Sequence, residues 1–237
     1  MHRSSLILLT LILIKMSKLV CIFPENETTD FLLPVYKQLK LLPDFVGYRF
    51  DTNDSSKIKN LFDELHLLDD DAFVFFIGHG ASNKLYGSVD KEGEKTILFD
   101  KANTECIKKN NVVGIACRSK EFADDNNILN YIGFGDITSD YSEVLAERNI
   151  GDPDYLDWAS EEDIINFRNE FVGAIADAVK LSECKSLQSI YRMMKLCFNK
   201  RIALLLVNRH ILNYRQVADM LYDINDEMLF KQESHSS

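Results

Sequence analysis

Short runs of apolar residues recur along this chain, and most of them are continuous rather than alternating with polar residues. A strand that exposes one face to water alternates, whereas a strand buried on both faces does not. Stretches with helical spacing separate the runs. The order therefore predicts an α/β fold, a three-layer α/β/α sandwich around a mostly parallel central sheet. The predicted strands are Leu19–Phe23, Val46–Phe50, Phe73–Ile77, Val112–Ala116 and Tyr131–Phe134.

The segments between these runs are predicted to be helical, and the last third of the chain is almost wholly of this kind. Ser55 and Ser56 precede one such segment and are expected to cap its first turn. Ile202–Val207 is apolar throughout and is predicted to be a short buried strand among the helices. A Lys-Glu-Gly turn at 91–93 predicts a small hairpin beside the sheet. The predicted helices are Thr29–Leu42, Ser55–Leu68, Ala102–Lys109, Glu161–Leu181, Ser186–Phe198 and Tyr214–Phe230.

The 237-residue chain has no linker rich in Gly, Pro or Ser, which predicts a single domain over residues 16–237. Residues 6–14, LILLTLILI, are too few to span a bilayer, and no small-residue cleavage site follows them. We therefore interpret residues 1–15 as a non-native extension from a mis-assigned start, in preference to a secretion signal. This interpretation predicts a cytoplasmic protein without stable membrane insertion.

The charge of the chain and its cysteines exclude several classes of function. The formal net charge is -10 at pH 7, and lysine and arginine form only short pairs, so a nucleic-acid partner is not expected. The chain has five cysteines and no C-x-x-C spacing, so we expect reduced thiols and neither a metal site nor another cofactor. Of the five, Cys117 alone follows a predicted strand directly and precedes a polar turn.

Two predicted strands end in residues that are capable of chemistry. FVFFIGHGAS at 73–82 places His79 after one strand, and NNVVGIACRS at 110–119 places Cys117 after another. Functional side chains of a parallel sheet gather at the carboxyl ends of its strands. If the two strands are neighbours, the imidazole can take the thiol proton and later protonate a leaving amine. The sequence therefore predicts a Cys117–His79 catalytic dyad.

The residues around the dyad suggest an oxyanion hole. Gly80 has no side chain, so its backbone can approach a substrate closely, and its amide together with that of Cys117 can stabilise a tetrahedral intermediate. Taken alone, Gly78-His79-Gly80 is typical of a tight turn, and a cysteine at a strand end is typical of a buried core. Because the two motifs end successive predicted strands, we favour catalysis.

An apolar strand that ends in His-Gly, followed by one that ends in Ala-Cys, resembles the caspase-like (clan CD) cysteine peptidases, and most of all their bacterial CHAT-domain branch. The match covers roughly residues 18–200 and includes the segment Ile132–Phe134 with the aspartates after it. Ile115 and Ser119 stand where caspases have Gln and Gly, so aspartate specificity is not implied. The resemblance implies a caspase-like fold and a cytosolic endopeptidase with a protein substrate. The resemblance also implies a role in a bacterial immune or stress cascade, in which the substrate is an effector such as a gasdermin-like pore former or a toxin.

Acidic loops predict the preference at the cleaved position. Glu25 follows the first strand, and Asp136 and Asp140 follow the fifth, all at the edge of the sheet where Cys117 is expected. A carboxylate in the specificity pocket favours cleavage after arginine or lysine. Asp140 is the first candidate for the floor of the pocket and Asp136 the second. Alternatively, both aspartates cap a helix that begins near Ser142.

Two other classes of function remain open from the sequence. A non-catalytic caspase-like adaptor would bind its partners through the acidic surface and the C-terminal helices. An α/β-hydrolase ranks third, because the chain has no G-x-S-x-G motif.

Overall fold

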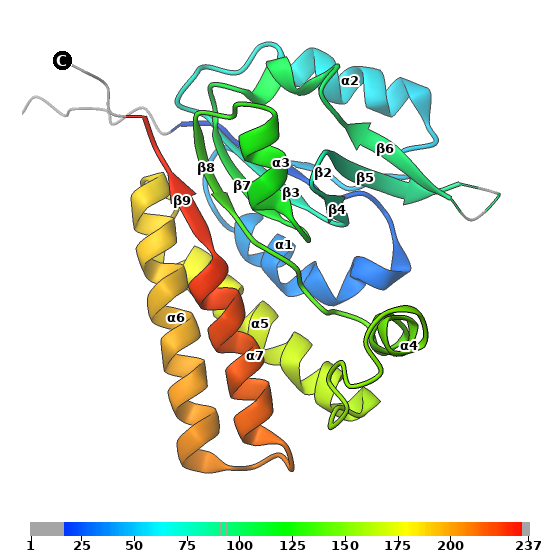
Figure 1. The fold of residues 1–237 in the computed structure, drawn as a ribbon. Coiled ribbons are helices and arrows are strands. Elements are labelled where there is room, and N and C mark those ends of the chain that lie inside the picture. The colour runs from blue at the N-terminus through cyan, green and yellow to red at the C-terminus, as the bar shows by residue number, and fades with distance from the viewer. Residues whose placement is uncertain (1–16, 91, 93, 234–237) are drawn as a thin grey trace, which may run out of the picture.

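The computed structural model describes residues 17–90, 92 and 94–233, so the predicted extension at 1–15 lies outside the described residues. Within them, one sheet has the strand order β2-β1-β3-β7-β8-β9 (Figure 1). Neighbouring strands run parallel except β9, which is antiparallel to β8. The fold is therefore α/β with a mostly parallel sheet, as predicted. Its strands are β1 (Leu19–Ile22), β2 (Phe45–Tyr48), β3 (Phe73–Ile77), β7 (Asn111–Ile115), β8 (Asn130–Gly133) and β9 (Leu229–Lys231).

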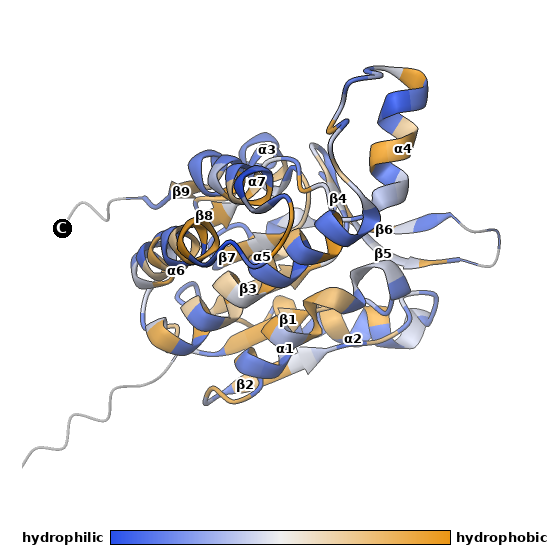
Figure 2. Cartoon of the chain, turned by 90° about the horizontal axis from the view of Figure 1, so that it is seen from below, coloured by the Kyte–Doolittle hydropathy of each residue, from blue (hydrophilic) through white to orange (hydrophobic). Residues whose placement is uncertain are grey.

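Helices cover both faces of this sheet, because successive side chains of each strand point to opposite sides. Cys21 and Phe75 belong to one buried cluster, with α1 (Leu33–Leu39) and the long helices α5, α6 and α7. Val20 and Val74 belong to the other cluster, with helices α2 and α3. Strand β1 is hydrophobic along its whole length, whereas the helices carry both kinds of residue (Figure 2). The remaining bounds are α2 (Ser55–Leu65), α3 (Ser119–Asp125), α5 (Glu161–Ser182), α6 (Leu187–Asn208) and α7 (Tyr214–Glu227).

A second, three-stranded antiparallel sheet follows β3 directly and contains the predicted hairpin. Its strands are β4 (Gly80–Ala81), β5 (Lys84–Val89) and β6 (Lys95–Phe99). Two 3-10 turns, η1 (Glu27–Leu32) and η2 (Thr104–Ile107), lie where the beginning of one helix and the whole of another were predicted. Helix α4 (Tyr141–Ile150) follows the strand β8 and lies at the carboxyl edge of the main sheet (Figure 1).

Two local predictions are wrong. Ile202–Val207 is not a strand but part of α6, because an unbroken apolar run of this length fits a helix equally well. The cap of α2 is Asp54, one residue before the predicted serines, and its carboxylate accepts the amide hydrogens of Ser56 and Lys57. In the part of the chain that the structure describes, no helix is both long enough and apolar enough to cross a membrane.

Candidate active site

Cys117 lies in a tight turn between β7 and α3. The next residue, Arg118, has the left-handed backbone angles φ 53° and ψ 27°, which cost a non-glycine residue about 1 kcal/mol. The Arg118 amide donates to the Gly135 carbonyl at 2.8 Å, and this bond ties the turn to the segment that follows β8. The chain therefore turns sharply just after the cysteine, at the carboxyl end of its strand.

His79 lies beside this turn because β3 and β7 are adjacent parallel strands with Ile77 opposite Ile115. The Gly78 amide donates to the Ile115 carbonyl at 3.1 Å, so the pairing continues up to the histidine. His79 and Cys117 line one small apolar cavity, together with Leu32, Ile137 and Phe171 among others. The structure thus brings together the two residues of the predicted dyad.

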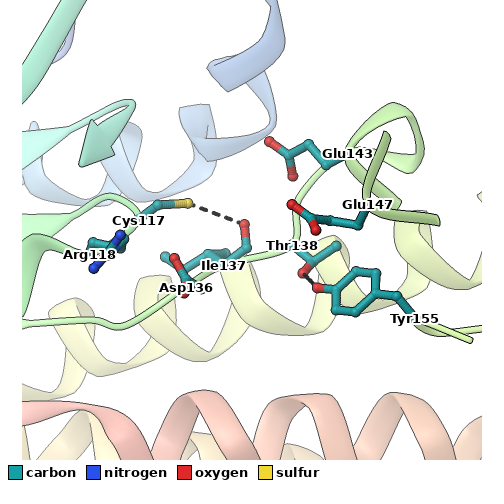
Figure 3. A pocket seen from close by; sticks show the side chains of 8 residues that line it. All are labelled: Cys117, Arg118, Asp136, Ile137, Thr138, Glu143, Glu147 and Tyr155. Atoms are coloured by element: carbon teal, nitrogen blue, oxygen red, sulfur yellow. Dashed lines mark hydrogen bonds between the residues drawn. The ribbon is translucent and has the colours of Figure 1, made fainter. Parts of the chain in front are cut away.

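In this state the two residues have separate hydrogen-bond partners. The Cys117 thiol donates to the Ile137 carbonyl at 3.3 Å (Figure 3). The His79 Nε2 atom lies 2.6 Å from the Thr28 hydroxyl. No hydrogen bond joins Cys117 to His79 within the described residues. Catalytic hydrogen bonds often form only in the complex with substrate, so the missing bond does not count against the predicted dyad.

The surroundings keep both groups of the dyad neutral. Burial raises the pKa of Cys117 to about 11; the bond to Ile137 opposes this rise, and the Glu143 carboxylate adds to it. Burial lowers the pKa of His79 to about 4, and the Lys95 ammonium lowers it further. The neutral thiol and the neutral imidazole are therefore the forms present at neutral pH.

The residues predicted to form the oxyanion hole are in contact. A β-carbon on Gly80 would overlap the Cys117 carbonyl oxygen and lie 3.1 Å from the Ala116 β-carbon, so only glycine allows this approach. The Tyr86 amide donates to the His79 carbonyl at 3.0 Å. Because antiparallel pairs alternate, Gly80 opposite Leu85 is a pair without hydrogen bonds, and its amide points away from β5.

An open cavity of about 570 Å³ adjoins the thiol, and we call it the thiol cavity. Figure 3 shows two glutamates of α4 projecting toward the side where Cys117 lies. Glu143 uses its Oε2 atom to accept the Ser139 and Asp140 amides at 2.9 and 3.2 Å. Glu147 has no side-chain partner among the described residues. The cavity is lined by Cys117, Arg118, Asp136, Ile137, Thr138, Glu143, Glu147 and Tyr155.

The three predicted specificity residues lie in different places. Asp136 lines the thiol cavity. Asp140 is not among its lining residues; it caps α4 by accepting the Ser142 amide at 2.8 Å, which is the alternative that the sequence left open. Glu25 lines another cavity, on the side of the Thr28 loop.

The sequence reasoning missed Glu143 and Glu147. They lie four residues apart, which places them on one face of any helix at this position. This spacing was the available signal, but only the fold shows that the face turns toward the cysteine.

The other cysteines lie away from this site, and all five thiols are free. Cys21, Cys184 and Cys197 are buried in the core, and the half-buried Cys106 thiol donates to the Asn103 carbonyl at 3.2 Å. Nowhere in residues 17–90, 92 and 94–233 do three or more His, Cys, Asp or Glu side chains gather so as to hold a metal ion.

Comparison of the chain with protein-family models, with curated proteins and with solved structures gives no match.

Proposed function

We propose that this protein is a cysteine endopeptidase in which Cys117 is the nucleophile and His79 the general acid and base. One observation carries the proposal: the two side chains line a shared cavity at the carboxyl ends of adjacent parallel strands. Either residue alone fits a structural role. Together, at the edge of the sheet where functional groups gather, they fit nucleophilic catalysis.

The proposed cleavage of the peptide bond starts from a neutral Cys117 thiol and a neutral His79 imidazole. The Cys117 thiol gives its proton to the His79 imidazole as sulfur bonds to the scissile carbonyl carbon. The Gly80 and Cys117 amides hold the developing oxyanion. As the C–N bond breaks, the imidazolium returns the proton to the leaving amine. Water, activated by the imidazole, then hydrolyses the thioester and restores the thiol.

The thiol cavity favours a basic residue at the cleaved position. Asp136, Glu143 and Glu147 line it, and the two side chains of Asp136 and Glu147 have no hydrogen-bond or ion-pair partner among the described residues. A guanidinium or ammonium group would pair with these carboxylates, whereas an acidic side chain would be repelled. Cleavage after arginine or lysine is therefore the expected preference.

The resemblance to caspase-like peptidases of the CHAT branch adds a cellular location and a kind of substrate to this proposal. It supports a cytoplasmic protease that cuts a protein partner, such as a gasdermin-like effector or a toxin, in an immune or stress cascade. The proposed chemistry needs no cofactor and does not depend on which partner is cut.

A peptide library with cleavage sites mapped by mass spectrometry tests the proposal. Cys117→Ala should abolish cleavage without unfolding the protein, because it removes one sulfur atom at a strand end. Cys106→Ala is the matched control: its thiol also donates to a backbone carbonyl, and burial also raises its pKa to about 11. Normal turnover by Cys117→Ala would exclude it as the nucleophile.

The adaptor alternative is favoured by a different observation. Large apolar side chains are exposed near the end of α6 and just after it, among them Val207 at 76% and Leu212 at 91%. Exposed apolar side chains that gather in a patch are typical of protein-binding surfaces. If the wild-type protein cleaves nothing in the library but retains a partner that a Val207→Lys variant loses, the adaptor is the better proposal.

A further inference from the structure

The hydroxyl of Thr28 lies between His79 and a second polar side chain. Thr28 Oγ1 is 2.6 Å from His79 Nε2 and 2.7 Å from the Oδ1 atom of Asn26. Asn26 is the N-cap of the 3-10 turn η1, which follows strand β1 and reaches the edge of the sheet where the dyad lies. Sequence reasoning did not identify either residue as part of the site.

The direction of each hydrogen bond follows from counting protons. Asn26 Oδ1 also accepts the Thr28 amide hydrogen at 3.0 Å. If the side-chain amide of Asn26 were flipped, its NH₂ group would face the N–H of Thr28, and two donors would meet without an acceptor. A carbonyl oxygen only accepts, so the Thr28 hydroxyl must give its single proton to Asn26. The Thr28 oxygen is then left to accept, and His79 Nε2 must carry the hydrogen.

This assignment fixes the role of the other ring nitrogen. A neutral imidazole has one N–H and one lone pair, and a hydrogen on Nε2 leaves the lone pair on Nδ1. His79 Nδ1 has no hydrogen-bond partner among the described residues. It is therefore the atom of the ring that is free to act as a base.

We propose that Thr28 and Asn26 are positioning residues that hold His79 as the Nε2–H tautomer and orient its ring, so that Nδ1 accepts the proton of the Cys117 thiol. The hydroxyl also remains a suitable acceptor when the ring becomes an imidazolium, because both ring nitrogens then carry hydrogen. The same contact therefore serves the ring before and after proton transfer. The benefit for catalysis rests on the proposed function, but the tautomer does not.

Nitrogen-15 NMR of the imidazole provides a test that does not depend on peptidase activity. In the wild-type protein at neutral pH, Nε2 should show the shift of a protonated nitrogen and Nδ1 that of a lone pair. In Thr28→Val, the Nε2 hydrogen should exchange with water at least about tenfold faster, since it has lost its acceptor. Thr28→Ser keeps the hydroxyl and should restore slow exchange.

Kinetics supplies the second measurement. Thr28→Val should lower kcat by about 10- to 100-fold with little change in KM, because a misoriented base affects the transition state and not substrate binding. Thr28→Ser should recover most of the rate. Thr104→Val is the matched control, because Thr104 also donates its hydroxyl to an asparagine oxygen, that of Asn126 at 3.3 Å. It should leave the His79 signals and kcat unchanged.

Three results would overturn the proposal: a wild-type ring protonated at Nδ1, unchanged exchange in Thr28→Val, or an unchanged kcat in that variant. The failure of the proposed function would look different. In that case no cleavage would be seen in any variant, yet the Nε2 hydrogen would still lose its protection when Thr28 becomes valine.

Discussion

Two acidic cavities of similar size lie near the dyad, but only one of them adjoins the thiol. The thiol cavity measures about 570 Å³, and the second measures about 630 Å³ and is called the N-terminal cavity here. The Thr28 side chain that contacts His79 belongs to the second cavity. The N-terminal cavity is lined by Glu25, Asn26, Glu27, Thr28, Asp30, Arg49, Asp51, Ser88 and Val89.

Among the described lining residues, the N-terminal cavity contains an ion pair and the thiol cavity does not. In the N-terminal cavity, Arg49 pairs with Asp30 at 2.9 Å, and the same guanidinium stacks over the Phe23 ring at 4.7 Å. In the thiol cavity, Asp136 and Glu147 have no ion-pair partner among the described residues. Size and acidity alone therefore do not single out a specificity pocket. Unpaired carboxylates beside the proposed nucleophile favour the thiol cavity for that role. His79 lies between the two regions, because it contacts Thr28 and shares a small cavity with Cys117.

Among the changes that test this comparison, the largest effect should come from His79, which contacts Thr28 of one region and shares a small cavity with Cys117 of the other. His79→Ala should lower the rate of peptide cleavage by roughly two to four orders of magnitude, the usual range for a lost general acid and base. Single-turnover kinetics on a peptide from the library measures this rate. If His79→Ala keeps more than a tenth of the wild-type rate, a group other than His79 must take up the thiol proton.

The burial of His79 between the cavities should also make stability depend on pH. Its pKa falls from 6.5 to about 4 on folding, so between these values the unfolded chain binds a proton that the folded protein does not. The free energy of unfolding should therefore decrease as pH falls from about 6.5 to 4, by at most ~3 kcal/mol.

Urea unfolding of the wild type and of His79→Gln across this range measures that contribution. Carboxylates elsewhere titrate in both proteins, so the difference between the two isolates the histidine. If the free energies of unfolding of the two proteins change in parallel from pH 6.5 to 4, folding does not lower the pKa of His79, and the ring is not buried as described.

The next effect distinguishes the two cavities directly. Glu147→Gln removes one unpaired charge from the thiol cavity and should lower kcat/KM for peptides with arginine at the cleaved position by about 10- to 100-fold. Peptides with leucine at that position should be much less affected. Glu25→Gln, an equivalent change in the N-terminal cavity, should leave both values within about twofold. The opposite pattern would assign the specificity pocket to the N-terminal cavity.

The comparison also shows what the sequence can predict and where it stops. The strands β3 and β7 were readable, because each is a continuous apolar run and each ends in a distinctive residue. Their adjacency was a conditional expectation, since hydrophobic patterns do not encode the order of strands in a sheet. Thr28, which contacts His79, and Glu147, which lines the thiol cavity, come from η1 and α4. Both elements are far from the dyad in the chain, so only folding brings them near it. The strand β9 has three residues at the edge of the sheet, too few to show a periodicity.

The smallest expected effect concerns Asp140, which the sequence analysis placed first as the floor of the specificity pocket. Its carboxylate caps α4, and bonds from the side chain and amide of Ser142 lower its pKa. Asp140→Ala should therefore cost about 1 kcal/mol of stability above pH 4, and less as the carboxylate of the wild type is protonated below that pH. The preference for arginine over leucine should be unchanged, because Glu147 and Asp136 remain in the thiol cavity.

Asp54→Ala is the matched control for this cap. Asp54 caps α2 in the same manner, by accepting the Ser56 amide at 3.1 Å, and it lines neither of the two cavities. Both variants should lose similar stability in urea unfolding, and neither should change the cleavage map. If Asp140→Ala alone loses its preference for arginine, the Asp140 carboxylate must contact the substrate in addition to capping α4. The thiol cavity would then include the loop before α4 as well as the helix itself.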